Sequence, residues 1–112
     1  MKIKKSNHPN GLCTSFSLIT FYASANDIIE KFGNPVYNEP ENYEDKVTRE
    51  WELELEDGTY FTIYDWKEER YFCDDERIYW HVGTEWSSKD REKRDEKVRL
   101  ALEEAGFKNY MV

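Results

Sequence analysis

Residues 47–66 constrain the fold more than any other part of this chain, because they have the pattern of a β-hairpin. Apolar and acidic residues alternate along the first half, as in a strand with one buried face and one exposed face. The pair Asp57-Gly58 interrupts the pattern, and a second strand-forming run follows over 59–66. The alternating residues of the first half are Glu50, Trp51, Glu52, Leu53, Glu54, Leu55 and Glu56.

The length of the turn decides which side chains share the buried face. A two-residue turn would place Phe61 and Ile63 on the glutamate face, whereas a three-residue loop over 56–58 places them on the leucine face. We choose the three-residue loop because it buries the apolar residues together. Gly58 then occupies the left-handed position of a type I turn with a G1 bulge, which glycine adopts without steric cost.

The chosen register predicts the cross-strand partners on both faces of the hairpin. At the far end of the core face, Arg49 meets Asp65 in an inward-leaning ion pair. The other core-face partners are Leu55–Thr59, Leu53–Phe61 and Trp51–Ile63, and those on the opposite face are Glu54–Tyr60, Glu52–Thr62 and Glu50–Tyr64. The opposite face is either a solvated sheet surface, where Tyr and Thr favour strands and Glu favours solubility, or a ligand surface.

The remaining segments predict a single α+β domain over residues 1–112. We expect a small antiparallel sheet of three to four strands with the hairpin at its centre, one short helix and a C-terminal helix. Ser24 caps the short helix, Asp27 completes an approximate capping box, and Gly33 ends it. The predicted segments are a loose or edge-paired leader over 1–11, strands over 16–23 and 78–82, helices over 25–32 and about 88–105, and loops over 36–46 and 67–77. Only the second half of the last helix has an apolar stripe, so we expect that half alone to dock firmly.

The net charge of -8 is concentrated in residues 37–76. An acidic surface repels nucleic acid and anionic membranes, so we expect no direct nucleic-acid binding and no membrane binding. The two cysteines are too few for a disulfide framework, and no apolar stretch is long enough for a signal peptide or a membrane span. These features predict a reduced protein of the cytoplasm.

Aromatic residues make up 16% of the chain and crowd together around residues 66–86. This is more than one small core usually takes, so we expect some of them to face a ligand or a partner, including a second copy in a homo-oligomer. If Trp80 packs inward beside Ile63, His81 emerges on the same outer face as Tyr64 and Glu52. This convergence is the best site candidate that the pattern alone supplies.

No catalytic or metal-binding signature stands out. The four soft or borderline ligands match no zinc spacing, and we expect neither a metal nor a cofactor. They are His8, Cys13, Cys73 and His81. Cys13 or Ser15 with His81 as base would form a nucleophilic pair, but nothing in the sequence places them together. Binding fits the residues better, because aromatic faces stack on planar rings while Lys46, Lys67 and His81 hold phosphates or carbonyls.

Five sequence blocks, taken together, resemble a family of small bacteriophage and related viral proteins. The blocks are residues 11–16 (GLCTSF), 32–35 (FGNP), 46–51 (KVTREW), 57–67 (DGTYFTIYDWK) and 80–83 (WHVG). The resemblance covers roughly residues 11–84, and it departs from the family at Cys13, at Ser17 and Leu18 in place of Gln-Gly, and at Thr84 in place of Gly. The resemblance implies an α+β fold and a viral accessory protein. It implies no particular activity.

The family-matching residues include polar ones that packing alone does not require. From them and the aromatic face we predict a ligand-binding site made of Thr14, Ser15, Lys46, Tyr64, Asp65, Trp66, Lys67 and His81. The leading hypothesis is a non-enzymatic counter-defence protein in the cytoplasm of an infected host, which binds a nucleotide-type immune signal or a host defence protein. The alternatives are a small nucleotide hydrolase or phosphodiesterase that uses His81, and an acidic mimic of nucleic acid that binds a basic host protein through its glutamate face.

Overall fold

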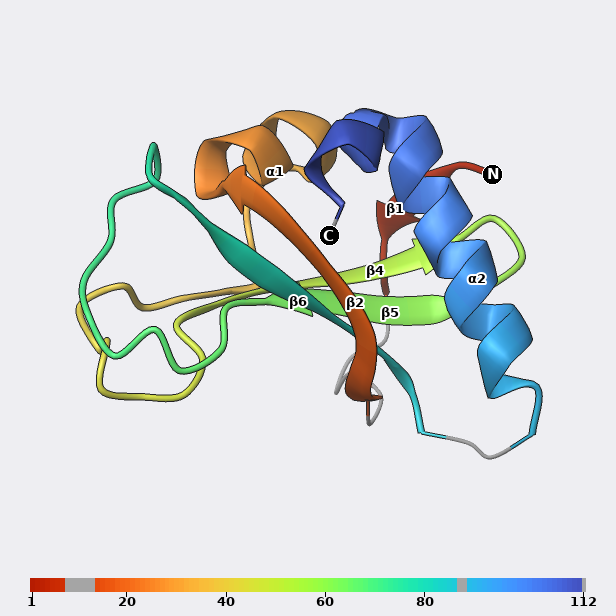
Figure 1. Cartoon of the computed structure of the whole chain (residues 1–112), viewed down its shortest axis with the longest axis horizontal. Helices are drawn as coiled ribbons and strands as arrows, with labels where there is room; N and C mark the ends of the chain where they lie inside the picture. Colours follow the sequence, from red (N-terminus) through yellow and green to blue (C-terminus); the bar gives the residue numbers. More distant parts are fainter. Residues whose placement is uncertain (8–13, 87–88, 112) are drawn as a thin grey trace.

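A computed structural model of the chain describes residues 1–7, 14–86 and 89–111. The fold is α+β, as predicted (Figure 1). Two strands precede the first helix, and four more strands separate it from the second helix. The strands are β1 (Ile3–Lys5), β2 (Thr14–Ser24), β3 (Tyr37–Asn38), β4 (Arg49–Leu55), β5 (Tyr60–Tyr64) and β6 (Arg77–Glu85). The helices are α1 (Ala25–Phe32) and α2 (Arg91–Leu102), and α2 continues into two irregular helical turns, Glu103–Phe107 and Lys108–Tyr110. No helix in the described ranges is both long enough and apolar enough to cross a membrane.

The strands form one antiparallel sheet in the order β1-β4-β5-β6-β2, and β3 pairs with β4 beside β1. The sheet therefore has six strands, more than the three to four that the sequence predicts. The two additional strands are β1 and β3, which have 3 and 2 residues. Such short segments contain too few residues to show the two-residue period by which a strand is recognised.

The central hairpin has the predicted register. Trp51 pairs with Ile63 and Leu53 with Phe61, while Glu50 lies opposite Tyr64 on the other face. The loop over 56–58 is closed by a hydrogen bond of 2.9 Å from Gly58 N to Leu55 O, and Gly58 is left-handed with φ 88°. The choice of the loop that buries the apolar residues together is confirmed.

The two helices lie on one side of the sheet, which gives a molecule of two layers (Figure 1). One continuous core fills the space between the layers. It includes Trp51, Phe61, Ile63, Trp80 and Val82 from the sheet, and Ile28, Val98, Leu102 and Phe107 from the helical layer. The indole of Trp80 packs edge-on against that of Trp51, with ring centroids 5.4 Å apart. Because alternate residues of these strands face the helices, the residues between them face away on the open side of the sheet.

The predicted ion pair between Arg49 and Asp65 is wrong. Both residues are buried, but the guanidinium of Arg49 binds Asp74 at 2.8 Å and the carbonyl oxygen of Phe72 at 3.1 Å, and it also lies over the Phe72 ring. Asp65 instead accepts three hydrogen bonds from the chain entering β4, two from Thr48 and one from the amide of Arg49. The long side chain of Arg49 reaches past the short aspartate to a loop whose position the strand pattern does not specify.

Helix α1 begins and ends as predicted. Ser24 is the N-cap, and its hydroxyl accepts a hydrogen bond of 3.1 Å from Asp27 N, while Asp27 accepts one from Ser24 N. At the other end, Gly33 donates its amide to Ile29 O and has φ 82°. The capping box and the terminating glycine together fix the length of this helix.

The C-terminal helix docks along more of its length than the sequence predicts. Its apolar residues Val98, Ala101 and Leu102 are buried, as expected. However, the charged first half also binds the sheet, because Arg91 donates to Ser15 O and Phe16 O and Arg94 donates to Glu85 O. The expectation that only the second half docks is therefore wrong. This docking could not be predicted from the sequence, because it uses polar side chains and backbone carbonyls and so produces no apolar periodicity.

The predicted leader over 1–11 is not loose where the structure describes it. Residues 3–5 pair with residues 53–55 as the edge strand β1, which bears out the edge-paired alternative. The rest of the predicted leader includes residues 8–11, which lie outside the described residues, as does Cys13. The connection over 36–46 contains β3, which the sequence does not predict.

Candidate functional site

A cavity of about 460 Å³ opens on the face of the sheet that the helices leave uncovered. Its walls come from the start of β2, the segment before β4, the end of the hairpin far from its turn, and β6. It is lined by Thr14, Ser15, Phe16, Val47, Glu50, Tyr64, Trp66 and His81. We call this cavity the open-face pocket. Its volume lies within the range of small-molecule sites, about 300 to 1,000 Å³.

The ladder of the sheet positions three of these side chains in one row. Glu50 of β4 pairs with Tyr64 of β5, and Tyr64 pairs in turn with His81 of β6. Neighbouring strands are about 4.8 Å apart, so side chains in a row across the sheet touch or nearly touch. The convergence of Tyr64 and His81, inferred from the alternation of their strands, is therefore present in the structure.

Aromatic rings form most of the pocket wall. The ring of His81 lies 4.5 Å from that of Phe16 and 5.8 Å from that of Tyr64, measured between centroids. The indole of Trp66 stands edge-on to Tyr64 at 6.2 Å and is 39% exposed. Flat, partly exposed rings of this kind offer stacking surfaces for a planar ligand.

Two lysines flank the exposed indole. The ammonium of Lys46 lies 6.0 Å from the Trp66 ring centroid, and that of Lys67 lies 5.5 Å from it. The backbone joins the two residues, because Lys67 N donates to Lys46 O at 2.8 Å, and Lys67 is left-handed with φ 50°. The predicted site thus acquires positive charge beside Trp66, at the edge of an otherwise acidic surface.

Asp65, like Lys46 and Lys67, is a predicted site residue that does not line the pocket. It is buried, and it holds Thr48 and Arg49 by the three hydrogen bonds described above. These bonds tie the segment that carries Val47 to the end of β5, immediately before Trp66. Asp65 therefore supports the shape of the pocket from behind and does not line it.

The structure brings five of the predicted residues to the pocket wall and adds three others. The five are Thr14, Ser15, Tyr64, Trp66 and His81, and the three that the sequence prediction omitted are Phe16, Val47 and Glu50. The hairpin register already placed Glu50 opposite Tyr64, so that signal was available for Glu50. Phe16 and Val47 come from segments that only the tertiary fold brings together.

The close approach of β2 to the hairpin depends on Gly83. A Cβ at this position would lie 2.7 Å from Thr62 Oγ1 and 2.8 Å from Thr14 Oγ1, so any larger residue would push the strands apart. The two threonine hydroxyls are 3.2 Å from each other. The hydroxyl of Ser15 is buried and has no hydrogen-bond partner among the described residues. Ser15 pairs with Thr84, whose hydroxyl binds Asp95 of α2, so the Ser15 hydroxyl points to the helical side of the sheet and not into the pocket.

Burial controls the ionisation of the pocket residues. It raises the pKa of Glu50 above its ordinary value, and the nearby carboxylates of Glu52 and Asp65 raise it further. Burial also raises the pKa of the Tyr64 phenol and lowers that of His81. At neutral pH His81 is therefore an uncharged imidazole and Tyr64 an uncharged phenol.

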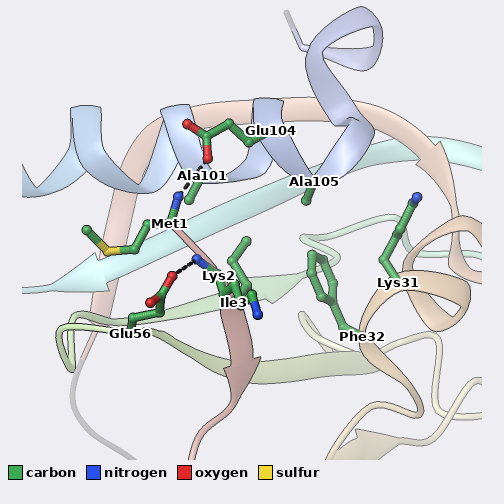
Figure 2. A pocket seen from close by; sticks show the side chains of 9 residues that line it. All are labelled: Met1, Lys2, Ile3, Lys31, Phe32, Glu56, Ala101, Glu104 and Ala105. Carbon is green, nitrogen blue, oxygen red and sulfur yellow. Dashed lines mark hydrogen bonds and ion pairs between the residues drawn. The ribbon is translucent and has the colours of Figure 1, made fainter.

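A second hollow, of about 420 Å³, lies on the helical side of the molecule beside β1 (Figure 2). We call it the terminal hollow. It is lined by Met1, Lys2, Ile3, Lys31, Phe32, Glu56, Ala101, Glu104 and Ala105. Its two carboxylates are paired, since the amine of Met1 donates to Glu104 at 2.6 Å and the backbone amide of Lys2 donates to Glu56 at 2.5 Å. Both carboxylates of the terminal hollow therefore already have partners within the protein.

No cluster of three metal-ligating side chains occurs in the part of the chain that the structure describes. Cys73 is free and exposed. No family model, no curated protein and no solved structure matches this chain.

Proposed function

We propose that this chain is a small, non-enzymatic binding protein that takes a nucleotide-type ligand in its open-face pocket. The observation that carries the proposal is the combination of aromatic walls with two lysines beside the exposed Trp66. A nucleotide has a flat base, which stacks on rings, and phosphates, which attract ammonium groups. Together with the viral resemblance, this supports a counter-defence role in the cytoplasm of an infected cell, in which the ligand is an immune signal.

A pocket of this shape favours a small ligand over a host protein. Protein partners bury extended surfaces, about 800 Å² on each side, whereas a cavity of this size encloses a single small molecule. The acidic-mimic alternative requires a displayed row of carboxylates. Glu52 and Glu54 are themselves half-buried opposite Thr62 and Tyr60, so that face does not present the regular exposed charge of a nucleic-acid backbone.

The hydrolase alternative requires His81 to act as an acid or a base. A catalytic imidazole is normally oriented by a second polar group. The described residues give His81 ring contacts with Phe16 and Tyr64 but no hydrogen-bond partner. Ring contacts on two sides suit a stacking role for His81, so we favour binding without turnover.

The test is a titration of the purified chain with AMP, GMP, CMP, UMP and cyclic dinucleotides, followed by calorimetry and by native mass spectrometry. Trp66→Ala is the informative variant, because removing one stacking side chain costs about 1 to 3 kcal/mol per base. The matched control is Trp86→Ala, since Trp86 is also exposed, at 74%, and does not line the pocket. We expect binding to weaken about tenfold or more in Trp66→Ala and to stay unchanged in Trp86→Ala.

The fate of the ligand separates a binding protein from a hydrolase. After denaturation, a binding protein releases the nucleotide at its original mass, and a hydrolase releases a product. Loss of turnover in His81→Ala with the fold intact would support the hydrolase. If no nucleotide binds, and Lys67→Ala leaves phage growth on defended hosts unchanged, the proposed function is wrong.

A further inference from the structure

Glu50 gives the open-face pocket a feature that stacking alone does not explain. It lies in β4 between Tyr37 of β3 and Tyr64 of β5, so the strands on both sides fix its backbone. Its side chain lines the pocket and is partly buried. Among residues 1–7, 14–86 and 89–111, its carboxylate forms no hydrogen bond and no ion pair. An ionised carboxylate in the wall of a cavity, with no partner in the described protein, is available to a ligand that donates hydrogen bonds to it.

The charges of the pocket are separated. The two ammonium groups lie over the ring of Trp66, and neither forms an ion pair with Glu50. The carboxylate end repels phosphate, and the lysine end attracts it. A nucleotide can satisfy both ends only if its phosphates lie near Trp66 and the edge of its base faces Glu50.

A carboxylate accepts two parallel hydrogen bonds from adjacent N–H groups. Guanine has such a pair on one edge, the ring N1–H and the exocyclic 2-amino group. Adenine and cytosine place a bare ring nitrogen beside their amino group, and uracil places carbonyls on both sides of its N–H. In each of those bases a lone pair would face the carboxylate.

We infer that the open-face pocket selects guanine nucleotides, with Glu50 reading the N1–H and 2-amino edge of the base. This inference rests on the proposed function and adds the identity of the base. The aromatic rings hold the plane of the base, and Glu50 determines which base fits.

The experiment compares the dissociation constants of GMP, IMP and AMP. IMP retains the N1–H and lacks only the 2-amino group, so it removes one of the two donors. We expect GMP to bind about tenfold more tightly than IMP and about 100-fold more tightly than AMP. In Glu50→Gln the carboxamide keeps the shape of the side chain but offers one acceptor and one donor, so the preference for GMP over AMP should fall below about threefold.

Two controls keep the result specific to Glu50. Glu54→Gln removes a carboxylate from the same face of β4, away from the pocket, and should leave the base preference unchanged. Glu50→Asp keeps the charge but shortens the reach, and should weaken GMP without creating a preference for AMP. Circular dichroism confirms that each variant is folded.

The outcomes separate the inference from the proposed function. Equal binding of GMP, IMP and AMP would retain the nucleotide pocket and overturn guanine selection. Tight binding of methylguanidinium that competes with GMP, together with unselective nucleotide binding, would also overturn guanine selection, because the carboxylate would then be binding a simple cation. Absence of binding by all three nucleotides would overturn the proposed function together with the inference.

Discussion

The open-face pocket and the terminal hollow have similar volumes, about 460 and 420 Å³, but they differ in what their polar groups bind. In the terminal hollow, the amine of Met1 and the amide of Lys2 bind Glu104 and Glu56. In the open-face pocket, the carboxylate of Glu50 forms no hydrogen bond and no ion pair with the described part of the chain. Unpaired polar groups are costly to a fold, and they persist where a ligand pairs with them.

The two regions also differ in the contacts that hold their walls in place. The terminal hollow is backed by apolar contacts such as that between Phe32 and Phe107, whose rings lie 5.9 Å apart. The open-face pocket is backed by the buried hydrogen bonds of Asp65 to Thr48 and Arg49. Volume alone does not distinguish a binding site from a gap between packed elements, whereas the state of the polar groups does.

The largest expected effect is on the support of the open-face pocket. Asp65→Ala leaves the Thr48 hydroxyl and two amides without their acceptor, so we expect the free energy of unfolding to fall by about 3 kcal/mol. Urea denaturation measures this loss. Glu104→Ala in the terminal hollow is the comparison, because its exposed ion pair should contribute no measurable stability. Equal losses in the two variants would remove the distinction between the regions.

The next prediction separates the effect on stability from the effect on nucleotide binding, with one variant in each region. Phe32→Ala removes a partly buried ring from the terminal hollow, so we expect a loss of about 2 kcal/mol in the free energy of unfolding. Nucleotide affinity should stay the same in that variant. Trp66→Ala should show the opposite result, weak binding with nearly unchanged stability. A drop in nucleotide affinity in Phe32→Ala would show that the terminal hollow takes part in binding.

A smaller effect concerns the pH dependence of stability. Burial raises the pKa of Glu50, so the folded state disfavours its charged form, and this penalty applies once the pH rises above that pKa. Glu50→Gln should therefore stabilise the ligand-free protein by about 0.5 kcal/mol at neutral pH. The gain should disappear as the pH falls below the ordinary value of 4.5, where both proteins carry a neutral side chain. Thermal denaturation across this range measures the difference, and a destabilised variant at neutral pH would contradict it.

The smallest effect lies beside the terminal hollow. Hydrogen bonds from Lys97 and from the side chain and backbone of Thr59 hold the pKa of Asp57 down to about 2. A lowered pKa contributes stability above the ordinary value of 3.8, and that stability is lost as the pH falls toward about 2. Because the pair is exposed and screened, Asp57→Asn should cost only about 0.3 kcal/mol at neutral pH. The protein and the Asp57→Asn variant should become equally stable near pH 2. A stability difference that persists there would mean that the Asp57–Lys97 pair does not cause it.

The central hairpin could be predicted from the sequence because local signals agree with burial. Gly58, Trp51 and Leu53 specify one turn and one register, and the capping box of Ser24 specifies the start of α1. The partner of Arg49 could not be predicted, because Asp74 lies in a loop without periodicity. The pocket was predicted in part: strand alternation places Tyr64 and His81 together, whereas only the tertiary fold brings Phe16 and Val47 to them.

The outer edge of β2 bears on whether this protein self-associates. Bare strand edges recruit other chains into growing sheets and fibrils. Here Arg91 binds the carbonyls of Ser15 and Phe16, Met111 bridges to Phe21, and Leu18, which is left-handed with φ 71°, bends the strand between them. The edge therefore offers no long run of free backbone groups, so we expect it to be a poor template for edge-to-edge pairing with other chains.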